Sequence, residues 1–431
     1  MKKPKITNSN TLAINGGKKA IKKNIPVFNM IGRKELIAAK KVIKTGVLSR
    51  FLGTWGEDFY GGPKVLEFEK ACEEYFEVKH AISVNSWTSG LITAVGAIGI
   101  EPGDEIITSP WTMSASAMAI LHWNAIPVFA DIEEDTFCLS PKSILEKISS
   151  RTKAIIVVDI FGNSAKMREI MEIARQYKLK IISDTAQSPG ATYYGRKAGT
   201  IADIGGISLN YHKHIHTGEG GVLFTNDKEL AMRMKLIRNH AESVVKDTGR
   251  VDLNNMVGFN FRLGEIEAAI GIEQLKKLDS IINGNRKIAK DLVRELEGLA
   301  GLKLPMELEN TSHVFYSFPM IIDLNRIHTP RYKIIQALRA EGIPNLGEGY
   351  QNIHLLPIFQ KKVAYGSNGF PWILNEYAKN ISYSKGICPV AETLHSKSYI
   401  GFGISGLKLK EKDVKNIGIA FRKVWANLDS L

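Results

Sequence analysis

A lysine set among histidines is the residue in this sequence best placed to act as an amine nucleophile. The segment SLNYHKHIHTGEGG (208–221) follows an apolar run and places Lys213 on a predicted loop, just ahead of a tight glycine-rich turn. A lysine that is partly desolvated among basic groups has a lowered pKa and can attack as a neutral amine. The alternative for Lys213 is a solvated surface side chain, because most lysines are exposed.

The histidines around this lysine raise the question of a metal site. His212, His214 and His216 alternate along the segment, and alternate residues of an extended chain share one face. No cysteine or acidic residue is patterned around them except Glu219, which lies between glycines. We therefore expect loop or core histidines here and no metal.

A carboxylate ends another apolar run, in the segment ISDTAQSPGA (182–191). At the end of a strand, Asp184 could face a ligand crevice and pair with a positively charged ligand atom. A helix N-cap is the alternative, since aspartate commonly fills that role.

Two further segments could hold the phosphate and the flat face of a ligand. In VNSWTSGL (84–91) small hydroxyl residues lead into a predicted helix, and a helix N-terminus with free N–H groups binds phosphate. In SPWTMSAS (109–116), Trp111 follows a further strand and could stack on a ring. The alternatives are an ordinary helix cap for the first segment and a core aromatic for Trp111.

Together these four segments match the parts of pyridoxal 5′-phosphate. In chain order they offer a phosphate cradle, an aromatic face, a carboxylate for a protonated ring nitrogen and an amine for an aldehyde. The match requires that all four lie on the same edge of one sheet.

The elements between residues 80 and 225 can provide such an edge. Short runs of β-branched residues alternate there with amphipathic helices, which is typical of an α/β sheet buried on both faces. Ligands of such sheets bind beyond the carboxyl ends of the strands. The predicted strands are 80–84, 104–109, 126–131, 153–161, 180–184, 204–209 and 221–225, and the helices between them include 88–98, 112–122, 141–148 and 165–177.

The remainder of the chain frames this sheet. We divide it into an N-terminal arm (1–30), a large α/β domain (31–285) and a smaller α+β domain (286–431) that contains a strand at 313–322. Helices are predicted at 33–44 and 64–76, and one or two long helices over 259–300, with a break at Asn283-Gly284-Asn285.

Composition excludes several classes of protein. The 431 residues are 44% apolar, which argues against disorder, and 57 basic against 44 acidic side chains give a net charge of +13 that favours anionic partners. The lysines are scattered, so we expect no nucleic-acid partner.

Three distant cysteines indicate a reducing, cytoplasmic setting. The first ten residues, MKKPKITNSN, do not have the pattern of a signal peptide, so we expect none there. No run approaches about 18 consecutive apolar residues, so we expect no membrane span.

The motifs resemble those of the DegT/DnrJ/EryC1/StrS family of pyridoxal-phosphate-dependent sugar aminotransferases. The resemblance covers about residues 31–425 and is specific when the motifs are taken together. It rests on Gly61-Gly62-Pro63 with Phe68-Glu69, NSWTSGL, GIEPGDEIITSPWT (99–112), Asp184-Thr185-Ala186-Gln187-Ser188-Pro189-Gly190, Ser208 through Lys213 to Gly218-Glu219-Gly220-Gly221, Gly258-Phe259-Asn260-Phe261-Arg262 with Glu265 and Ala268-Ala269, GYQNIHLLPIF (349–359) and CPVAETL (388–394).

The resemblance implies the type I, aspartate-aminotransferase-like fold, with a large mixed, mostly parallel sheet and a smaller α+β C-terminal domain. It also implies pyridoxal 5′-phosphate as the cofactor, with Lys213 as the Schiff-base lysine and proton shuttle and Asp184 beside the protonated ring nitrogen. By the same resemblance Trp111 stacks on the ring and Gln187 lies near its phenolic oxygen.

Further site residues follow from the same resemblance. It implies that Trp87, Thr88 and Ser208 hold the phosphate, and that Asn260 reaches the phosphate of a neighbouring subunit, which makes the protein a homodimer with shared active sites. His354 and Tyr350 lie where the family's small domain closes on substrate.

The function implied is transfer of an amino group from glutamate or glutamine to a keto sugar by a ping-pong mechanism. The favoured acceptor is a nucleotide-linked keto-deoxyhexose. A glutamine-dependent keto-cyclitol (inosose) or aminoshikimate-type aminotransferase is the alternative, because such relatives often begin with an arm like Leu12-Ala13-Ile14-Asn15-Gly16-Gly17. A sugar dehydratase, in which histidine replaces the lysine, and a non-catalytic regulator on the same fold are further alternatives.

Four positions depart from the family pattern. Asn210 stands where members often have His or Gln, and Trp87 stands where they often have Gly. Asp159 takes a position that is commonly His, and Lys166 takes one that is commonly Asp. These departures leave the cofactor residues intact and the identity of the acceptor, the donor and the pathway open.

Overall fold

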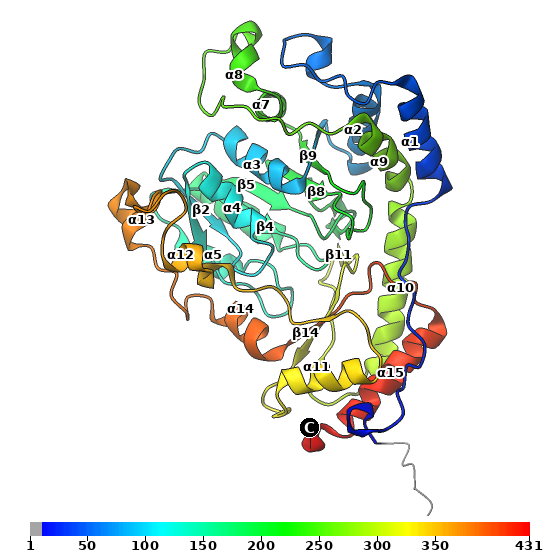
Figure 1. Cartoon of the computed structure of the whole chain (residues 1–431). Helices are drawn as coiled ribbons and strands as arrows, with labels where there is room; N and C mark the ends of the chain where they lie inside the picture. The colour runs from blue at the N-terminus through cyan, green and yellow to red at the C-terminus, as the bar shows by residue number, and fades with distance from the viewer. Residues whose placement is uncertain (1–10) are drawn as a thin grey trace, which may run out of the picture.

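A seven-stranded sheet forms the centre of the molecule in the computed structural model, which describes residues 11–431 (Figure 1). The first ten residues of the predicted arm, MKKPKITNSN, lie outside the described residues. The strand order is β1-β9-β8-β5-β4-β2-β3. Their bounds are β1 His80–Val84, β2 Glu105–Thr108, β3 Ile126–Phe129, β4 Thr152–Val158, β5 Lys180–Asp184, β8 Ile204–Ser208 and β9 Gly221–Thr225.

The sheet is mixed and mostly parallel, as predicted. Strand β9 is antiparallel to both of its neighbours, β1 and β8, and the pairs from β8 through to β3 are parallel. Each predicted strand coincides with an observed one. The longest, predicted over 153–161, ends at Val158, because the chain turns at Phe161, which has a positive φ of 59°.

Both faces of the sheet are covered, which explains its continuous apolar strands. Along β4, Ile155 and Val157 belong to one apolar core and Ile156 to the core on the opposite face. Helices α3, α4 and α7 cover the face of Ile156, while α5 and α6 contribute to the other core. Their bounds are α3 Trp87–Ala97, α4 Ala115–His122, α5 Pro141–Lys147, α6 Met167–Tyr177 and α7 Lys228–Arg238.

A long helix joins this large unit to a smaller one (Figure 1). Helix α10, Leu278–Leu296, runs without interruption through Asn283-Gly284-Asn285, where the sequence predicted a break. The prediction is wrong because Asn285 is buried and its Nδ2 donates a hydrogen bond to the Phe315 carbonyl at 3.3 Å. The chain breaks instead at Lys276-Lys277, between α9 (Glu265–Leu275) and α10.

The smaller unit packs helices on a four-stranded sheet of order β10-β12-β14-β13. Helices α11 and α15 share its apolar core with the arm residues Leu12 and Ile21. The arm is held by Glu341, whose carboxylate accepts hydrogen bonds from the Ala13 and Ala20 N–H groups at 2.7 and 3.0 Å. The bounds are β10 Leu302–Lys303, β12 Phe318–Ile322, β13 Leu346–Gly347, β14 Tyr399–Phe402, α11 Arg331–Ala340 and α15 Glu411–Trp425.

Part of the C-terminal third returns to the large sheet (Figure 1). Ile353 N–H donates to the Pro110 carbonyl at 2.7 Å, and Tyr383 Oη donates to the Pro127 carbonyl in β3 at 2.8 Å. Consequently residues 353–394 pack in one core with β2–β5, although the sequence predicted one C-terminal domain over 286–431. The helices here are α12 Pro357–Gln360, α13 Glu376–Asn380 and α14 Pro389–Thr393.

The remaining elements complete the outline. Helices α1 (Arg33–Thr45) and α2 (Pro63–Phe76) form where helices were predicted at 33–44 and 64–76, and both pack on α9. A small sheet of β11 (Thr311–Ser312), β6 (Thr192–Tyr193) and β7 (Arg196–Lys197) was not predicted, and α8 spans Ala241–Val244. Between residues 11 and 431, no helix combines the length and hydropathy needed to cross a bilayer.

Candidate active site

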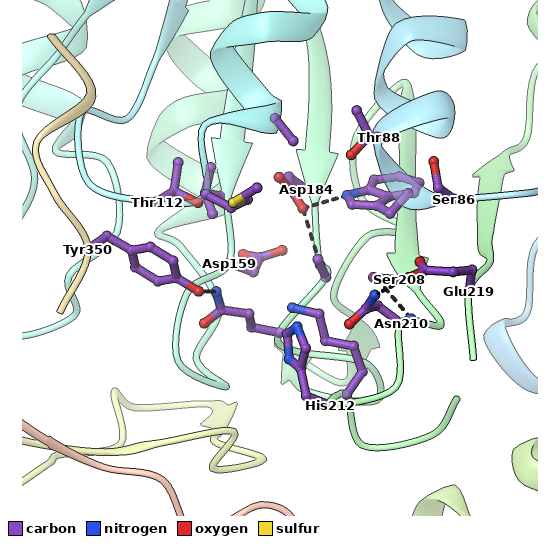
Figure 2. A pocket seen from close by; sticks show the side chains of 17 residues that line it. Ser86, Thr88, Thr112, Asp159, Asp184, Ser208, Asn210, His212, Glu219 and Tyr350 are labelled. Carbon is purple, nitrogen blue, oxygen red and sulfur yellow. Dashed lines mark hydrogen bonds between the residues drawn. The ribbon is translucent and has the colours of Figure 1, made fainter. Parts of the chain in front are cut away.

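Loops from the carboxyl ends of the parallel strands meet around a cavity of about 300 Å³ (Figure 2). Seven predicted site residues line it, and three others, Trp111, His354 and Asn260, do not. The lining residues are Ser86, Trp87, Thr88, Thr112, Met113, Ala115, Val158, Asp159, Asp184, Ala186, Gln187, Ser208, Asn210, His212, Lys213, Glu219 and Tyr350.

Lys213 lies on the loop after β8 and is buried, with 7% of its surface exposed. Its Nζ lies 4.9 Å from the ring centroid of Tyr316 and forms no hydrogen bond or ion pair within the part of the chain that the structure describes. Burial lowers the pKa of this amine to about 8, although the negative charge of Asp184 acts in the opposite direction. Lys213 is therefore an amine that loses its proton near neutral pH.

Asp184 ends β5 and is held on both carboxylate oxygens. Ser116 Oγ donates to Oδ2 at 2.7 Å, while the Trp87 indole Nε1 and the Ala186 N–H donate to Oδ1 at 2.6 and 3.3 Å. The side chain is buried, so these donors replace the water that an exposed carboxylate would bind. The cavity thus contains a fixed acceptor group, Asp184 (Figure 2), whose charge acts on the amine of Lys213 in the same lining.

The N-terminus of α3 supplies N–H groups to the same cavity. Ser86 is its N-cap, and its Oγ accepts a hydrogen bond from the Ser89 N–H at 3.0 Å. The N–H groups of Trp87 and Thr88 belong to the first turn, where helix geometry provides no partner. Ser208, at the end of β8, adds a hydroxyl. This arrangement is suited to a phosphate group.

Gln187 and Tyr350 lie across the cavity from α3 and bond to each other (Figure 2). Gln187 Nε2 donates to Tyr350 Oη at 2.9 Å, and its Oε1 accepts from the Phe161 N–H at 2.9 Å. Burial raises the pKa of the Tyr350 phenol, which therefore stays protonated at neutral pH. A residue predicted for the cofactor and one predicted for the substrate are thus in direct contact.

Trp111 lies in the core instead of facing the cavity. Its indole is fully buried, lies edge-on to Tyr399 at a centroid distance of 4.9 Å, and donates a hydrogen bond to the Tyr350 carbonyl. Met113, two residues further along, lines the cavity and is half exposed. The structure therefore does not place Trp111 where stacking on a ligand ring would require it, because its size fits the core below the loop of Tyr350.

His354 and Asn260 also lie outside the cavity lining. His354 is fully buried and its Nε2 bonds Glu392 Oε1 at 2.9 Å, while burial lowers the pKa of the imidazole. In this structure His354 is therefore packed against Glu392 and does not face the cavity. The Asn260 side chain is exposed, and its carbonyl accepts a hydrogen bond from Asn85 Nδ2 at 3.4 Å, next to the N-terminus of α3.

Several lining residues were not assigned a role from the sequence. Asp159 accepts hydrogen bonds from Ser183 Oγ and Thr185 Oγ1, both at 2.9 Å, and burial raises its pKa to about 6. Asn210 Nδ2 donates to Glu219 at 2.8 Å, and its Oδ1 has no partner. Both Asp159 and Asn210 stand at departures from the family motifs, and those departures were the available signal.

The three alternating histidines point to different surroundings. His212 Nδ1 bonds Tyr316 Oη at 2.8 Å, His214 Nε2 bonds the Val314 carbonyl at 3.0 Å, and the His216 N–H bonds Gln274. Over residues 11–431 no group of three histidine, cysteine or acidic side chains is arranged to hold a metal ion.

Comparison with known proteins identifies the family. The sequence profile of the DegT/DnrJ/EryC1/StrS aminotransferase family matches residues 54–392. The chain belongs to this family. A GDP-perosamine synthase of Caulobacter vibrioides is 36% identical over 297 residues, which cover 69% of this chain and 78% of that protein. An L-glutamine:2-deoxy-scyllo-inosose aminotransferase of Streptoalloteichus tenebrarius is 30% identical over 430 residues, 96% of this chain and 97% of that protein.

Solved structures of the DegT/DnrJ/EryC1/StrS family share the fold. The aminotransferase from Psychrobacter cryohalolentis superimposes with a TM-score of 0.78 at 26% identity, over 94% of this chain and all of that one. The type I transferase fold inferred from the motifs is confirmed. The chain is a pyridoxal-phosphate-dependent aminotransferase.

The cavity fits this cofactor. It contains an amine that deprotonates near neutral pH, a buried acceptor carboxylate and a helix N-terminus with free N–H groups, and these are the partners that an aldehyde, a protonated ring nitrogen and a phosphate require.

Proposed function

We propose that this enzyme transfers an amino group from glutamate or glutamine to a keto sugar, with a nucleotide-linked keto-deoxyhexose as the acceptor. The observation that carries the proposal is the meeting of Lys213, Asp184 and the N-terminus of α3 in one cavity. The similarity to GDP-perosamine synthase supports a nucleotide-linked acceptor, and the net charge of +13 favours anionic substrates.

Six residues would hold the cofactor. Lys213 would bind it through the side-chain amine, and Asp184 would accept a hydrogen bond from the protonated ring nitrogen. Trp87 and Thr88, through their N–H groups, and the Ser208 hydroxyl would bind the phosphate, with Gln187 beside the ring. Met113, which lines the cavity where Trp111 does not, would add an apolar contact to the ring. When bound, pyridoxal phosphate supplies an aldehyde for the amino group and a ring that withdraws electrons from the substrate's α-carbon.

The chain itself supplies the proton transfer. The Lys213 Nζ would take the proton from the substrate's α-carbon, because burial lowers its pKa to about 8 and so leaves part of the population neutral at pH 7. Asp184, held by the Trp87 and Ser116 side-chain donors, would face the cofactor's ring nitrogen as a hydrogen-bond acceptor. We propose that donor and acceptor react in turn in this cavity, by a ping-pong mechanism.

We further propose a homodimer with shared sites. Large apolar side chains on α1, on the loop after it and on α2 are exposed, among them Leu36, Ile43, Leu48, Leu52 and Leu66, and a second copy would cover them. The exposed side chain of Asn260, beside the N-terminus of α3, is free to reach the partner's phosphate site.

A keto-cyclitol acceptor is the second candidate. It is favoured by the inosose aminotransferase, whose similarity spans 96% of this chain. In the arm, Leu12 packs in the apolar core of the smaller unit, and a Cβ on Gly17 would lie 1.8 Å from the Thr11 carbonyl oxygen, which explains glycine at this position.

Isotope transfer distinguishes the two acceptors. The enzyme is supplied with glutamine labelled with ¹⁵N at the α-amino group, or with similarly labelled glutamate, and with either a nucleotide-linked 4-keto-6-deoxyhexose or scyllo-inosose. Mass spectrometry then detects the label in the product. We expect labelled amino sugar with the nucleotide-linked substrate. Label only in the cyclitol would establish the second candidate, and label in neither would refute both.

A further inference from the structure

Trp87 contributes more to the site than its backbone N–H. Its indole Nε1 lies 2.6 Å from Asp184 Oδ1, which is short for an N–H···O hydrogen bond. Ser116 Oγ holds the other oxygen at 2.7 Å. In Figure 2 the dashed line between an indole nitrogen and Asp184 marks the bond from Trp87 Nε1.

The fold makes room for this indole at two glycines. A Cβ on Gly206 in β8 would lie 2.3 Å from Trp87 Cζ3, and one on Gly90 in α3 would lie 2.7 Å from Trp87 Cε3. No side chain other than hydrogen fits at either position while the indole is present. The ring is therefore enclosed between strand and helix, with its N–H aimed at Asp184.

The chemistry of the indole determines what this contact does. An indole N–H only donates hydrogen bonds, so Asp184 Oδ1 has to act as the acceptor in this contact. We propose that Trp87 is a positioning residue that fixes the Asp184 carboxylate, as an acceptor, toward the cofactor's ring nitrogen. This inference rests on the proposed role of Asp184, and Trp87 acts only through that residue.

A purely structural role for Trp87 makes a different prediction. The indole also packs in the apolar core of α3, and loss of packing would weaken every cofactor equally. An effect of Trp87 that passes through Asp184 requires the nitrogen of the cofactor's pyridine ring. The effect therefore disappears with 1-deazapyridoxal phosphate, in which a C–H group replaces that nitrogen, and this thermodynamic cycle isolates the coupling.

The experiment compares dissociation constants of both cofactors for the apoenzyme and its variants. Trp87→Phe removes the indole N–H and keeps an aromatic ring. Trp123→Phe is the matched control, because Trp123 also packs against a glycine of α3, Gly96, and donates one hydrogen bond, to the Ile92 carbonyl at 2.7 Å. Should Trp87→Phe not fold, benzothienylalanine at position 87 keeps the bicyclic shape and replaces only the N–H with sulfur.

We expect Trp87→Phe to weaken pyridoxal phosphate about tenfold and to leave the deaza analogue within about twofold, because a hydrogen bond to a charged group is lost. Trp123→Phe leaves both constants unchanged. Equal weakening of both cofactors in Trp87→Phe, or no weakening, would overturn the inference. Asp184→Asn is measured alongside: if it weakens both cofactors equally, the proposed role of Asp184 itself fails.

Discussion

Burial, more than any neighbouring charge, sets the proton affinity of the Lys213 amine. Removal from water is the main cause of its lowered pKa, and the negative charge of Asp184 limits the shift. The same aspartate is held by Trp87 and Ser116, so one buried network sets both the proton affinity of the amine and the orientation of the carboxylate.

The first prediction concerns pH. Attachment of pyridoxal phosphate requires the neutral amine of Lys213, so the rate at which the apoenzyme gains its visible absorption should rise with pH about a midpoint near 8. In Asp184→Asn the charge that raises the pKa of Lys213 is gone, and the midpoint should move to lower pH. Stopped-flow absorbance measures both. A rate that still climbs steeply above pH 10 in the unaltered protein would contradict the burial argument.

Lys213→Ala should lower the turnover number by about 10²–10⁴-fold or more, since proton transfer by a positioned group contributes that much. The cofactor can still bind without a covalent link, so the protein should retain it more weakly. Lys276→Ala, at an exposed lysine on the surface, is the control and should keep full activity. Steady-state kinetics with labelled glutamate test this, and retained turnover in Lys213→Ala would exclude the lysine from the chemistry.

Residue types and strand ends allowed much of the site to be predicted, but side-chain direction did not follow from them. Lys213 and Asp184 were found because each stands at or just beyond the end of an apolar run. Whether Trp111 or Met113 faces the cavity depends on which side chain the core accepts, and Trp111 fits beneath the loop at Gly349 and Tyr350. His354 was misplaced for the same reason, because its partner Glu392 is distant in sequence.

At the scale of elements, the strands were predictable and the long-range packing was not. Continuous apolar runs such as KAIIVVDIF left no alternative to buried strands. In contrast, Asn283-Gly284-Asn285 has the composition of a turn, yet tertiary contacts of Asn285 keep α10 helical. Nothing local in residues 353–394 indicates that they pack on the large sheet, since their partners lie about 250 residues earlier.

The next prediction concerns Ser86, the N-cap of α3, which we expect both to stabilise the helix and to support binding of the cofactor's phosphate. Ser86→Ala removes the N-cap and should lower the free energy of unfolding by about 1 kcal/mol. Ser140→Ala, which removes the cap of α5 away from the cavity, should cost a similar amount. Only Ser86→Ala should also weaken pyridoxal phosphate binding. Urea unfolding and cofactor titration measure the two effects, and equal cofactor affinity in both variants would argue against the phosphate site.

At the scale of the whole molecule, the exposed apolar surface on α1 and α2 and the exposed side chain of Asn260 are the observations behind the proposed homodimer. A monomer would leave these side chains in water at a cost of about 25 cal/mol per Å². Analytical ultracentrifugation should therefore give the mass of two chains.

Mixed dimers test whether the sites are shared. Lys213→Ala and Asn260→Ala chains are each inactive or impaired alone, and unfolding and refolding them together forms hybrids. If Asn260 serves the partner's site, each hybrid has one site with both residues intact, and activity should recover to about a quarter of that of the unaltered dimer, given random pairing. No recovery would mean that Asn260 acts within its own chain or not at all.

The most direct test of the proposed function is the visible absorption spectrum of the purified enzyme, recorded before and after addition of glutamate or glutamine. If Lys213 holds pyridoxal phosphate and the cavity accepts an amino-acid donor, a visible band should be present, should disappear when a donor is added, and should return when a nucleotide-linked keto sugar follows. A protein that stays colourless when supplied with pyridoxal phosphate, or a band that no donor changes, would contradict the account.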